Sequence, residues 1–251
     1  MEISNQLAGH WLAAAAVFLL AGTVKGVIGL GLPTVAMALL ALWMPPAQAA
    51  ALLIVPSLVT NIWQTGPRAT FKPVLRRIGG MQAGIVAGTL GGALWLGVPG
   101  GAWASVALGL ALVVYALWGL TGRQLHVPPG RERWLGPAVG AATGLVTAVT
   151  GVFAMPAVPY MQALGFQRDA LIQAMGISFT TSTVVLAIGL AGNGGYPVSA
   201  LGGSIAMLLP AIGGMALGTW LRKRLPVAVF RRCFLAGLAL LGFYMVGRAL
   251  G

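Results

Sequence analysis

A row of polar side chains interrupts one of the apolar stretches of this sequence. Ser57, Thr60, Asn61 and Gln64 follow the spacing i, i+3, i+4, i+7, which places them on one face of a helix. Hydroxyl and amide groups can hold an oxyanion without the cost of burying several charges. Hydrogen bonding between helices is the alternative for Asn61 and Gln64. We favour anion binding for these two residues.

The second half of the chain carries a comparable set of polar residues. Gln173, Ser178 and Thr181 share one predicted span, and Thr147 and Thr150 lie beside an interruption of another apolar run. Hydroxyls in helices often bond to their own backbone, and we favour that alternative for the hydroxyl cluster of the span. Thr147 and Thr150 are better candidates for anion binding, because they lie beside the interruption.

Groups for acid–base chemistry are few and lie at loops or chain ends. The carboxylates are Glu2, Glu132 and Asp169, and the imidazoles are His10 and His126. A membrane enzyme or a carboxylate-driven proton pump needs such groups at membrane depth. We therefore expect no enzyme activity, no metal site and no cofactor.

The apolar run 11–43 is too long for a single membrane helix. One straight helix of this length would reach about 50 Å, against a hydrocarbon core of roughly 30 Å. Gly29, Gly31 and Pro33 punctuate the run. We predict a broken hairpin over 10–43, with a non-helical turn inside the membrane.

A second apolar run repeats this arrangement over 134–164, where Gly151 and Pro156 are among the interrupting residues. The second arm of each hairpin would begin near its proline, because proline suits the first helical position. The free N–H groups near Thr34 and Ala157 would then point at the membrane centre, where two helix N-termini favour an anion. Two matched, interrupted segments indicate a transporter's binding site.

Lys25 lies inside the first predicted hairpin, within the membrane. It follows Trp11 by about 21 Å of helix, which places it past mid-depth. It would either add positive charge to the anion site or extend to the cytoplasmic surface. The sequence leaves both alternatives open.

The composition is that of a polytopic membrane protein. The chain has 251 residues, of which 58% are hydrophobic and 7% charged. Its net charge of +12 comes from basic residues between apolar runs, so they are orientation signals with some attraction to membrane lipid, not a nucleic-acid surface.

The pattern predicts an all-α polytopic fold made of two inverted repeats, each a broken helical hairpin plus three transmembrane helices. The first repeat is 1–120, the cytoplasmic linker 121–133, and the second repeat 134–251. The expected elements are the hairpin 10–43 and spans 48–64, 78–96 and 102–120, then the hairpin 134–164 and spans 170–191, 198–221 and 227–249.

Charge decides between parallel and inverted repeats. If each interrupted segment is a hairpin, all Lys and Arg residues except Lys25 and Arg248 fall on one side, in loops 66–77, 121–133, 165–169 and 221–232. A single crossing per segment would instead divide these loops between both sides, against the positive-inside rule. We therefore predict inverted halves with both termini outside the cytoplasm.

Several motifs resemble the sulfite exporter TauE/SafE family over almost the whole chain. They are Lys25–Thr34, Met44–Ala50 and Pro56–Gln64, and in the second half Thr143–Gly151, Pro156–Tyr160 and Gln173–Thr180. The resemblance implies a transporter of sulfite, thiosulfate, sulfonates such as sulfoacetate, or related small anions. The family's glycine cluster is thinner here, with Leu30 and Leu32 interleaved.

Together these observations predict a plasma-membrane exporter of a small sulfur-containing anion that works by alternating access around a site between the two breaks. Uptake of the same anions and a passive channel are alternatives, and a non-transporting membrane scaffold is a more remote one. The partners expected are the anion and membrane lipid, with a homodimer left open and no nucleic acid.

Overall fold

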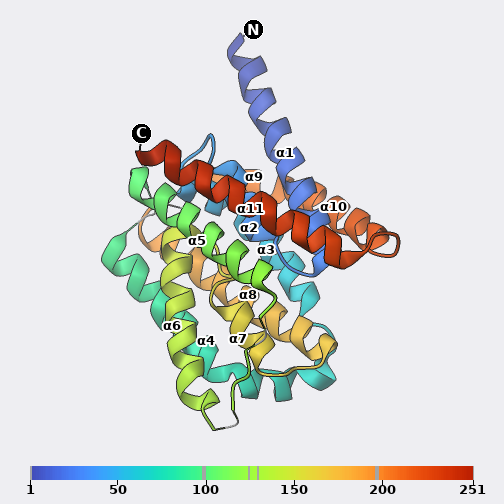
Figure 1. Ribbon diagram of the computed structural model, residues 1–251. Coiled ribbons are helices and arrows are strands. Elements are labelled where there is room, and N and C mark those ends of the chain that lie inside the picture. Colours follow the sequence, from blue (N-terminus) through green and yellow to red (C-terminus); the bar gives the residue numbers. More distant parts are fainter. Residues whose placement is uncertain (1, 98–99, 124, 129, 196–197, 251) are drawn as a thin grey trace.

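The computed structural model describes residues 2–97, 100–123, 125–128, 130–195 and 198–250. All regular structure in these residues is α-helical, as the sequence predicts (Figure 1). The helices are α1 Glu2–Ile28, α2 Leu32–Leu40, α3 Pro46–Gln64, α4 Arg68–Leu96, α5 Gly101–Thr121, α6 Glu132–Thr150, α7 Ala157–Ala163, α8 Arg168–Gly192, α9 Val198–Ala206, α10 Leu208–Leu221 and α11 Val227–Leu250.

Six helical stretches in the described part of the chain are long and apolar enough to cross a membrane. They are His10–Ile28, Pro46–Gln64, Gly101–Thr121, Arg168–Gly192, Ala200–Leu221 and Val227–Ala249. α4 is not among them, because its first turns are basic and its later turns are rich in glycine, which adds little hydropathy.

Both predicted interruptions are present. α1 ends at Ile28 and α2 begins at Leu32, and between them Gly29 and Gly31 have φ values of 87° and 113°. Residues with a side chain rarely adopt such angles, so glycine lets the chain leave one helix and enter the next within three residues. The second interruption separates α6 from α7, after Gly151 with φ 68°.

One predicted boundary was wrong. The basic segment 66–77, expected as a loop, is helical from Arg68 onward and forms the start of α4. Phe71, Val74, Leu75 and Ile78 explain this, because they follow helical spacing and pack against the core. The basic residues of the segment favoured a loop in the prediction, although the apolar face was present in the sequence.

The expected span 198–221 is confirmed as the apolar helical stretch Ala200–Leu221, with an interruption at Met207 between α9 and α10. Pro210 accounts for the division. It has no N–H for the carbonyl of Ala206, the last residue of α9, and its ring crowds that carbonyl.

The two most extensive helix pairs are α4 with α6 and α1 with α10. Glycine makes both possible. A Cβ placed on Gly84 of α4 would lie 2.8 Å from the backbone nitrogen of Ala141 in α6, and one on Gly26 of α1 would lie 2.9 Å from the Cα of Gly218 in α10. The helix backbones are therefore in direct contact, as small residues permit in membranes.

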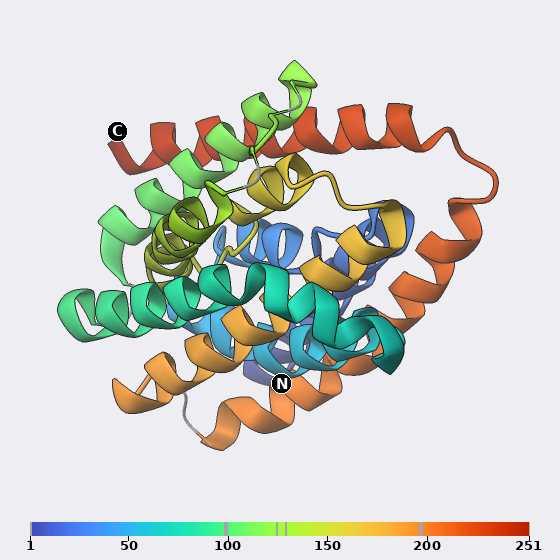
Figure 2. The same cartoon turned by 90° about the horizontal axis from the view of Figure 1, so that it is seen from below.

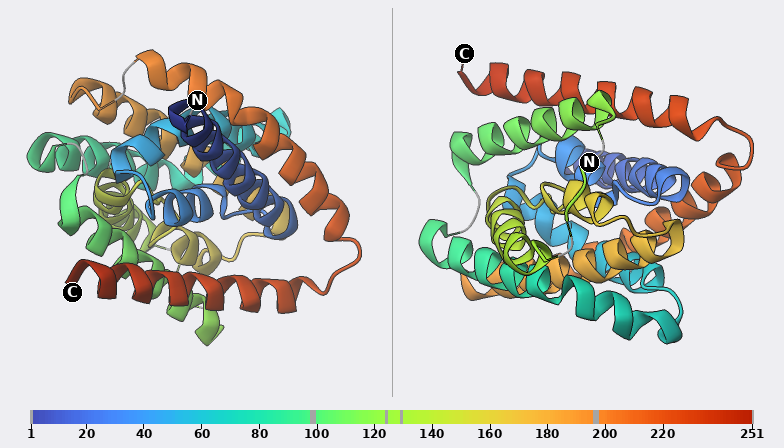
Figure 3. Two further views of the ribbon diagram at one scale, coloured as in Figure 1. Left: turned by 90° about the horizontal axis from the view of Figure 1, so that it is seen from above. Right: turned by 60° about the horizontal axis from the view of Figure 1, so that its bottom comes forward.

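These pairs join the two halves of the sequence. The first helix of each half packs against the helix that precedes the last one in the other half, so exchanging the halves would exchange the two interfaces. α5 and α11, the last helices of each half, pack against one another along one edge of the molecule (Figures 2 and 3). The predicted inversion of the halves and their boundaries stay predictions.

A proline inside α3 is compensated by a residue of α9. Pro56 cannot donate to the carbonyl of Leu52, four residues earlier, and the hydroxyl of Ser204 donates to that carbonyl at 2.8 Å. The N–H of Val55 in turn donates to the Ser204 hydroxyl at 3.0 Å. Ser204 is fully buried and so replaces a missing helical hydrogen bond from another helix.

Candidate functional site

The ammonium group of Lys25 lies in the interior of the protein. Lys25 is in the last turn of α1 and only 4% exposed. Its Nζ donates to the hydroxyl of Thr60 at 3.1 Å and to Oδ1 of Asn61, both on the polar face of α3. This geometry decides the alternative left open by the sequence: the side chain turns inward and does not extend to the surface.

No carboxylate of the described residues pairs with Lys25. Among the described residues the one salt bridge joins Arg77 to Glu132, in a different part of the molecule. Lys25 therefore pairs its charge with neutral oxygen atoms alone. The third N–H of the ammonium has no protein acceptor within the described residues.

The polar face of α3 extends from Lys25 toward α8. Asn61, fully buried, donates through Nδ2 to the hydroxyl of Thr183 at 3.4 Å. The hydroxyl oxygens of Ser57 and Ser182, on the same two helices, are buried and have no hydrogen-bond partner in the described part of the chain. Buried polar atoms are usually paired, so these two hydroxyls are available to a ligand.

Gln64 connects the same face to the first interruption. Its Nε2 donates to the carbonyl of Gly29 at 2.7 Å, whereas its Oε1 is buried and finds no partner among the residues that the structure describes. Gly31 and Pro33 start α2, and the hydroxyl of Thr34 in its first turn is also buried and unpaired. The first interruption, Lys25 and α3 thus form one contiguous polar region.

The second interruption is organised differently. The hydroxyls of Thr147 and Thr150 donate to their own helix, at Thr143 and Val146 respectively, and the Thr150 hydroxyl accepts the N–H of Val152 at 3.1 Å. These threonines therefore stabilise the end of α6.

Gly151 brings the two interruptions together. A Cβ on Gly151 would lie 2.9 Å from the methyl carbon of Met37 in α2. Pro156 and Ala157 begin α7 on the other side of the turn, and Ala157 is fully buried. The second interruption thus packs directly against the second arm of the first.

The three candidates on α8 lie apart from Lys25's contacts. Gln173 donates to the carbonyls of Thr65 and Pro67 and so caps the end of α3. Ser178 accepts from Gln82 of α4 at 2.8 Å, and the hydroxyl of Thr181 donates to its own helix at 3.1 Å. Each has a structural partner, and none of these bonds involves Lys25 or Asn61.

Residues 14–245 match the family described as sulfite exporter TauE/SafE. The chain belongs to this family. Comparison with curated proteins and with solved structures gave no match. TauE/SafE proteins are membrane transporters, so the family and the six apolar helical stretches together make this chain a multi-pass membrane protein of transporter type.

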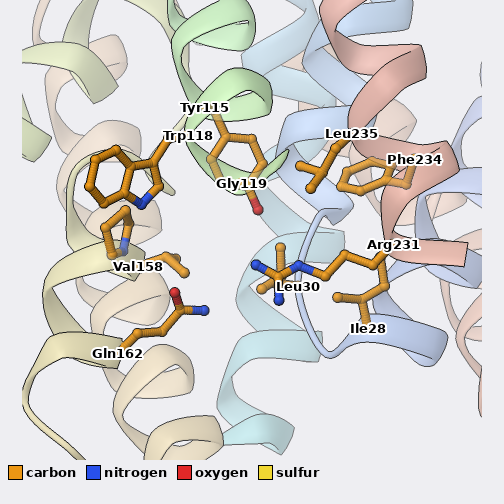
Figure 4. A pocket seen from close by; sticks show the side chains of 11 residues that line it. Ile28, Leu30, Tyr115, Trp118, Gly119, Val158, Gln162, Arg231, Phe234 and Leu235 are labelled. Atoms are coloured by element: carbon orange, nitrogen blue, oxygen red, sulfur yellow. The ribbon is translucent and has the colours of Figure 1, made fainter. Parts of the chain in front are cut away.

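Sequence reasoning missed a second polar region of this TauE/SafE protein. A cavity of about 20 Å³ lies between α5, α7 and α11. Ile28 and Leu30, at the first interruption, also line it. Figure 4 shows the polar ends of Tyr115, Gln162 and Arg231 directed into it. The only signal in the sequence was Gln162, a polar residue in an apolar run.

An ion pair lies at the C-terminal end of α7, beside the loops that we predict to be cytoplasmic. Arg77 of α4 binds Glu132 at the start of α6 through two hydrogen bonds of 3.1 and 2.7 Å, and it also donates to the carbonyl of Leu164 at 2.7 Å. Its guanidinium lies 4.6 Å from the centre of the Phe166 ring. The hydrogen bond from Arg77 lowers the pKa of Glu132 below its ordinary value.

Proposed function

We propose that this protein carries a small sulfur-containing oxyanion, such as sulfite, thiosulfate or an organosulfonate, across the plasma membrane by alternating access. The single observation that supports this is Lys25: a buried ammonium held by neutral groups, beside one of two adjoining helix interruptions. The TauE/SafE family supports an anion as the transported species.

The energetics favour an anion at this place. A buried cation without a counter-charge is costly, and two neutral acceptors compensate only part of the lost hydration. An oxyanion would supply the missing charge. It would take a hydrogen bond from Lys25, and the unpaired hydroxyls of Ser57, Ser182 and Thr34 could donate to its other oxygen atoms.

Export is the direction we propose. With a negative interior, outward movement of an anion releases about 2.3 kcal/mol per charge per 100 mV, so no coupling ion is required. The acidic residues of the sequence lie at loops and ends, which fits a carrier without a carboxylate-coupled proton step.

Flux into and out of proteoliposomes tests the proposal. The panel contains sulfite, thiosulfate, sulfoacetate, taurine, sulfate and a carboxylate, with Lys25→Met compared against Lys223→Met, an exposed lysine of the loop after α10. Loss of one charge-assisted hydrogen bond costs roughly 1.5–3 kcal/mol, so Lys25→Met should weaken binding by about ten- to a hundredfold, and more for a divalent anion. Lys223→Met should behave as the wild type.

Asn61→Ala adds a second readout. It removes the amide that accepts from Lys25, and we expect weaker anion binding in a protein that still purifies as a monodisperse species. Wild-type affinity in both Lys25→Met and Asn61→Ala would exclude this region as the binding site. Absence of flux for every anion in the panel would reject the transport proposal itself.

The finer topology is also part of the proposal: both termini outside the cytoplasm, inverted halves and a plasma-membrane location. Labelling with a membrane-impermeant maleimide tests it in a Cys233→Ser background. Arg123→Cys and Ala102→Cys lie near opposite ends of α5. In intact cells we expect labelling at 102 and not at 123, and the reverse pattern would overturn the orientation.

A further inference from the structure

The cavity beside the first interruption is lined by donors from three helices. Tyr115 and Trp118 come from α5, Gln162 from α7 and Arg231 from α11. Figure 4 shows the tyrosine hydroxyl, the indole nitrogen, the amide and the guanidinium all directed toward its centre. The described residues that line it include no carboxylate.

Tyr115 adds a polar group to the wall of the narrow cavity. The residue is 6% exposed, and its hydroxyl takes part in no hydrogen bond among the described residues and is not one of the buried unpaired atoms. The hydroxyl is therefore open to the cavity, where it can bond to a water molecule or a ligand. It points into the cavity, opposite the Arg231 guanidinium.

A larger cavity of about 610 Å³ continues from this one and shares Trp118, Gly119, Pro159, Gln162 and Arg231 with it. Arg123 and His126 add further basic groups, and its lining within the described part of the chain contains no carboxylate either. We call the two cavities together the basic vestibule. It lies among the loops that we predict to be cytoplasmic.

The vestibule leads toward the candidate site. Its narrow end is lined by Ile28 and Leu30, which flank Gly29, and the Gly29 carbonyl accepts the Gln64 amide. The narrow end has room for about one water molecule, so an oxyanion fits the wide part and cannot pass until the narrow part opens.

We infer that the basic vestibule is a second oxyanion site, on the path between the cytoplasm and Lys25. Arg231 and Gln162 line both cavities and bind the anion in the wide part, and the Tyr115 hydroxyl lies at the narrow end through which the anion would leave toward Lys25. The inference rests on the proposed function for the identity of the anion as the transported one. The site itself is defined by the vestibule's own donors.

Transport from the vestibule side measures the effect of Arg231. Arg231→Gln is compared with Arg232→Gln, the neighbouring arginine, which does not line either cavity. The KM for thiosulfate applied from the vestibule side should rise about ten- to a hundredfold in Arg231→Gln, because a charge-assisted hydrogen bond is lost. The affinity from the opposite side should stay unchanged. Tyr115→Phe should raise the same KM by a smaller factor.

Direct binding separates this inference from the proposed function. Trp118 lines both cavities, so its fluorescence reports binding in the vestibule. Thiosulfate should change this fluorescence in the wild type and in Lys25→Met but not in Arg231→Gln. Loss of the change in Trp118→Phe identifies Trp118 as its source. If no anion is transported but this Arg231-dependent signal persists, the proposed function fails and the site stands. If transport is normal and Arg231→Gln matches Arg232→Gln in both assays, the inference fails.

Anionic lipid is the other source of a similar headgroup. The titration is therefore made in nanodiscs of phosphatidylcholine and in nanodiscs containing phosphatidylglycerol. Equal thiosulfate affinity in both supports a soluble oxyanion. Loss of thiosulfate binding with phosphatidylglycerol, together with copurification of that lipid by the wild type and not by Arg231→Gln, would assign the vestibule to lipid and overturn the inference.

Discussion

Ser204→Ala should destabilise the protein through the carbonyl of Leu52. In the wild type this carbonyl accepts from Ser204 at 2.8 Å because Pro56 has no N–H to offer. Without the hydroxyl the partly buried carbonyl is unpaired, whereas the Val55 N–H can return to the helical acceptor four residues earlier. One lost buried hydrogen bond costs about 1–3 kcal/mol, so we expect a loss within this range.

A double-mutant cycle tests the reason as well as the magnitude. Pro56→Ala supplies an N–H to the Leu52 carbonyl, so the hydroxyl of Ser204 becomes dispensable. In that background Ser204→Ala should cost less than about 1 kcal/mol, which gives a coupling of roughly 1–2 kcal/mol between the two positions.

The assay is thermal or denaturant unfolding of the purified protein in detergent. Thr219→Ala serves as the control, because its hydroxyl is exposed and bonds only within α10. That variant should stay within about 0.5 kcal/mol of the wild type. If Ser204→Ala is equally costly with proline and with alanine at position 56, Ser204 does not compensate for the proline and the reasoning is refuted.

Two further predictions concern packing and pH. Gly84→Ala should destabilise the protein by about 1–3 kcal/mol in the same unfolding assay, because its Cβ would lie 2.8 Å from a backbone atom of α6. The control is Gly91→Ala, whose Cβ would lie in open space. It should leave the stability unchanged or raise it by up to about 1 kcal/mol. Because Arg77 lowers the pKa of Glu132, their pair stabilises fully above the unfolded pKa near 4.3 and loses this contribution as the pH falls through the lowered folded value. As the pH falls below the unfolded value, the melting temperature of Glu132→Gln should therefore change less than that of the wild type, and identical profiles would contradict this.

The sequence predicted the elements whose signal is local. The interruptions near Gly29 and Gly151 follow from an apolar run that is too long and from glycine and proline within it. The polar face containing Asn61 follows from helical spacing. These features depend on neighbours in the chain, so one sequence contains them.

Features that depend on tertiary contacts were not predictable. The inward position of Lys25 depends on α3 lying beside the end of α1, and the role of Ser204 depends on α9 reaching Pro56. Tyr115 and Arg231 lie in separate helices, and neither belongs to a local motif. The hydroxyl of Thr150 bonds to its own helix, an alternative that spacing alone could not exclude.

The exchanged helix pairs have a consequence for movement and assembly. α1 is in backbone contact with α10, and α4 is in backbone contact with α6. Each of these two helix pairs therefore contains one helix from each half of the chain. A rearrangement that opens the protein to alternate sides would then move α1 with α10 against α4 with α6, not the first half against the second. During synthesis, α1 enters the membrane long before α10 exists. Gly22 and Gly26, which lie against the α10 backbone, therefore have no partner until nearly the whole chain has been made, and neither half alone can complete its packing.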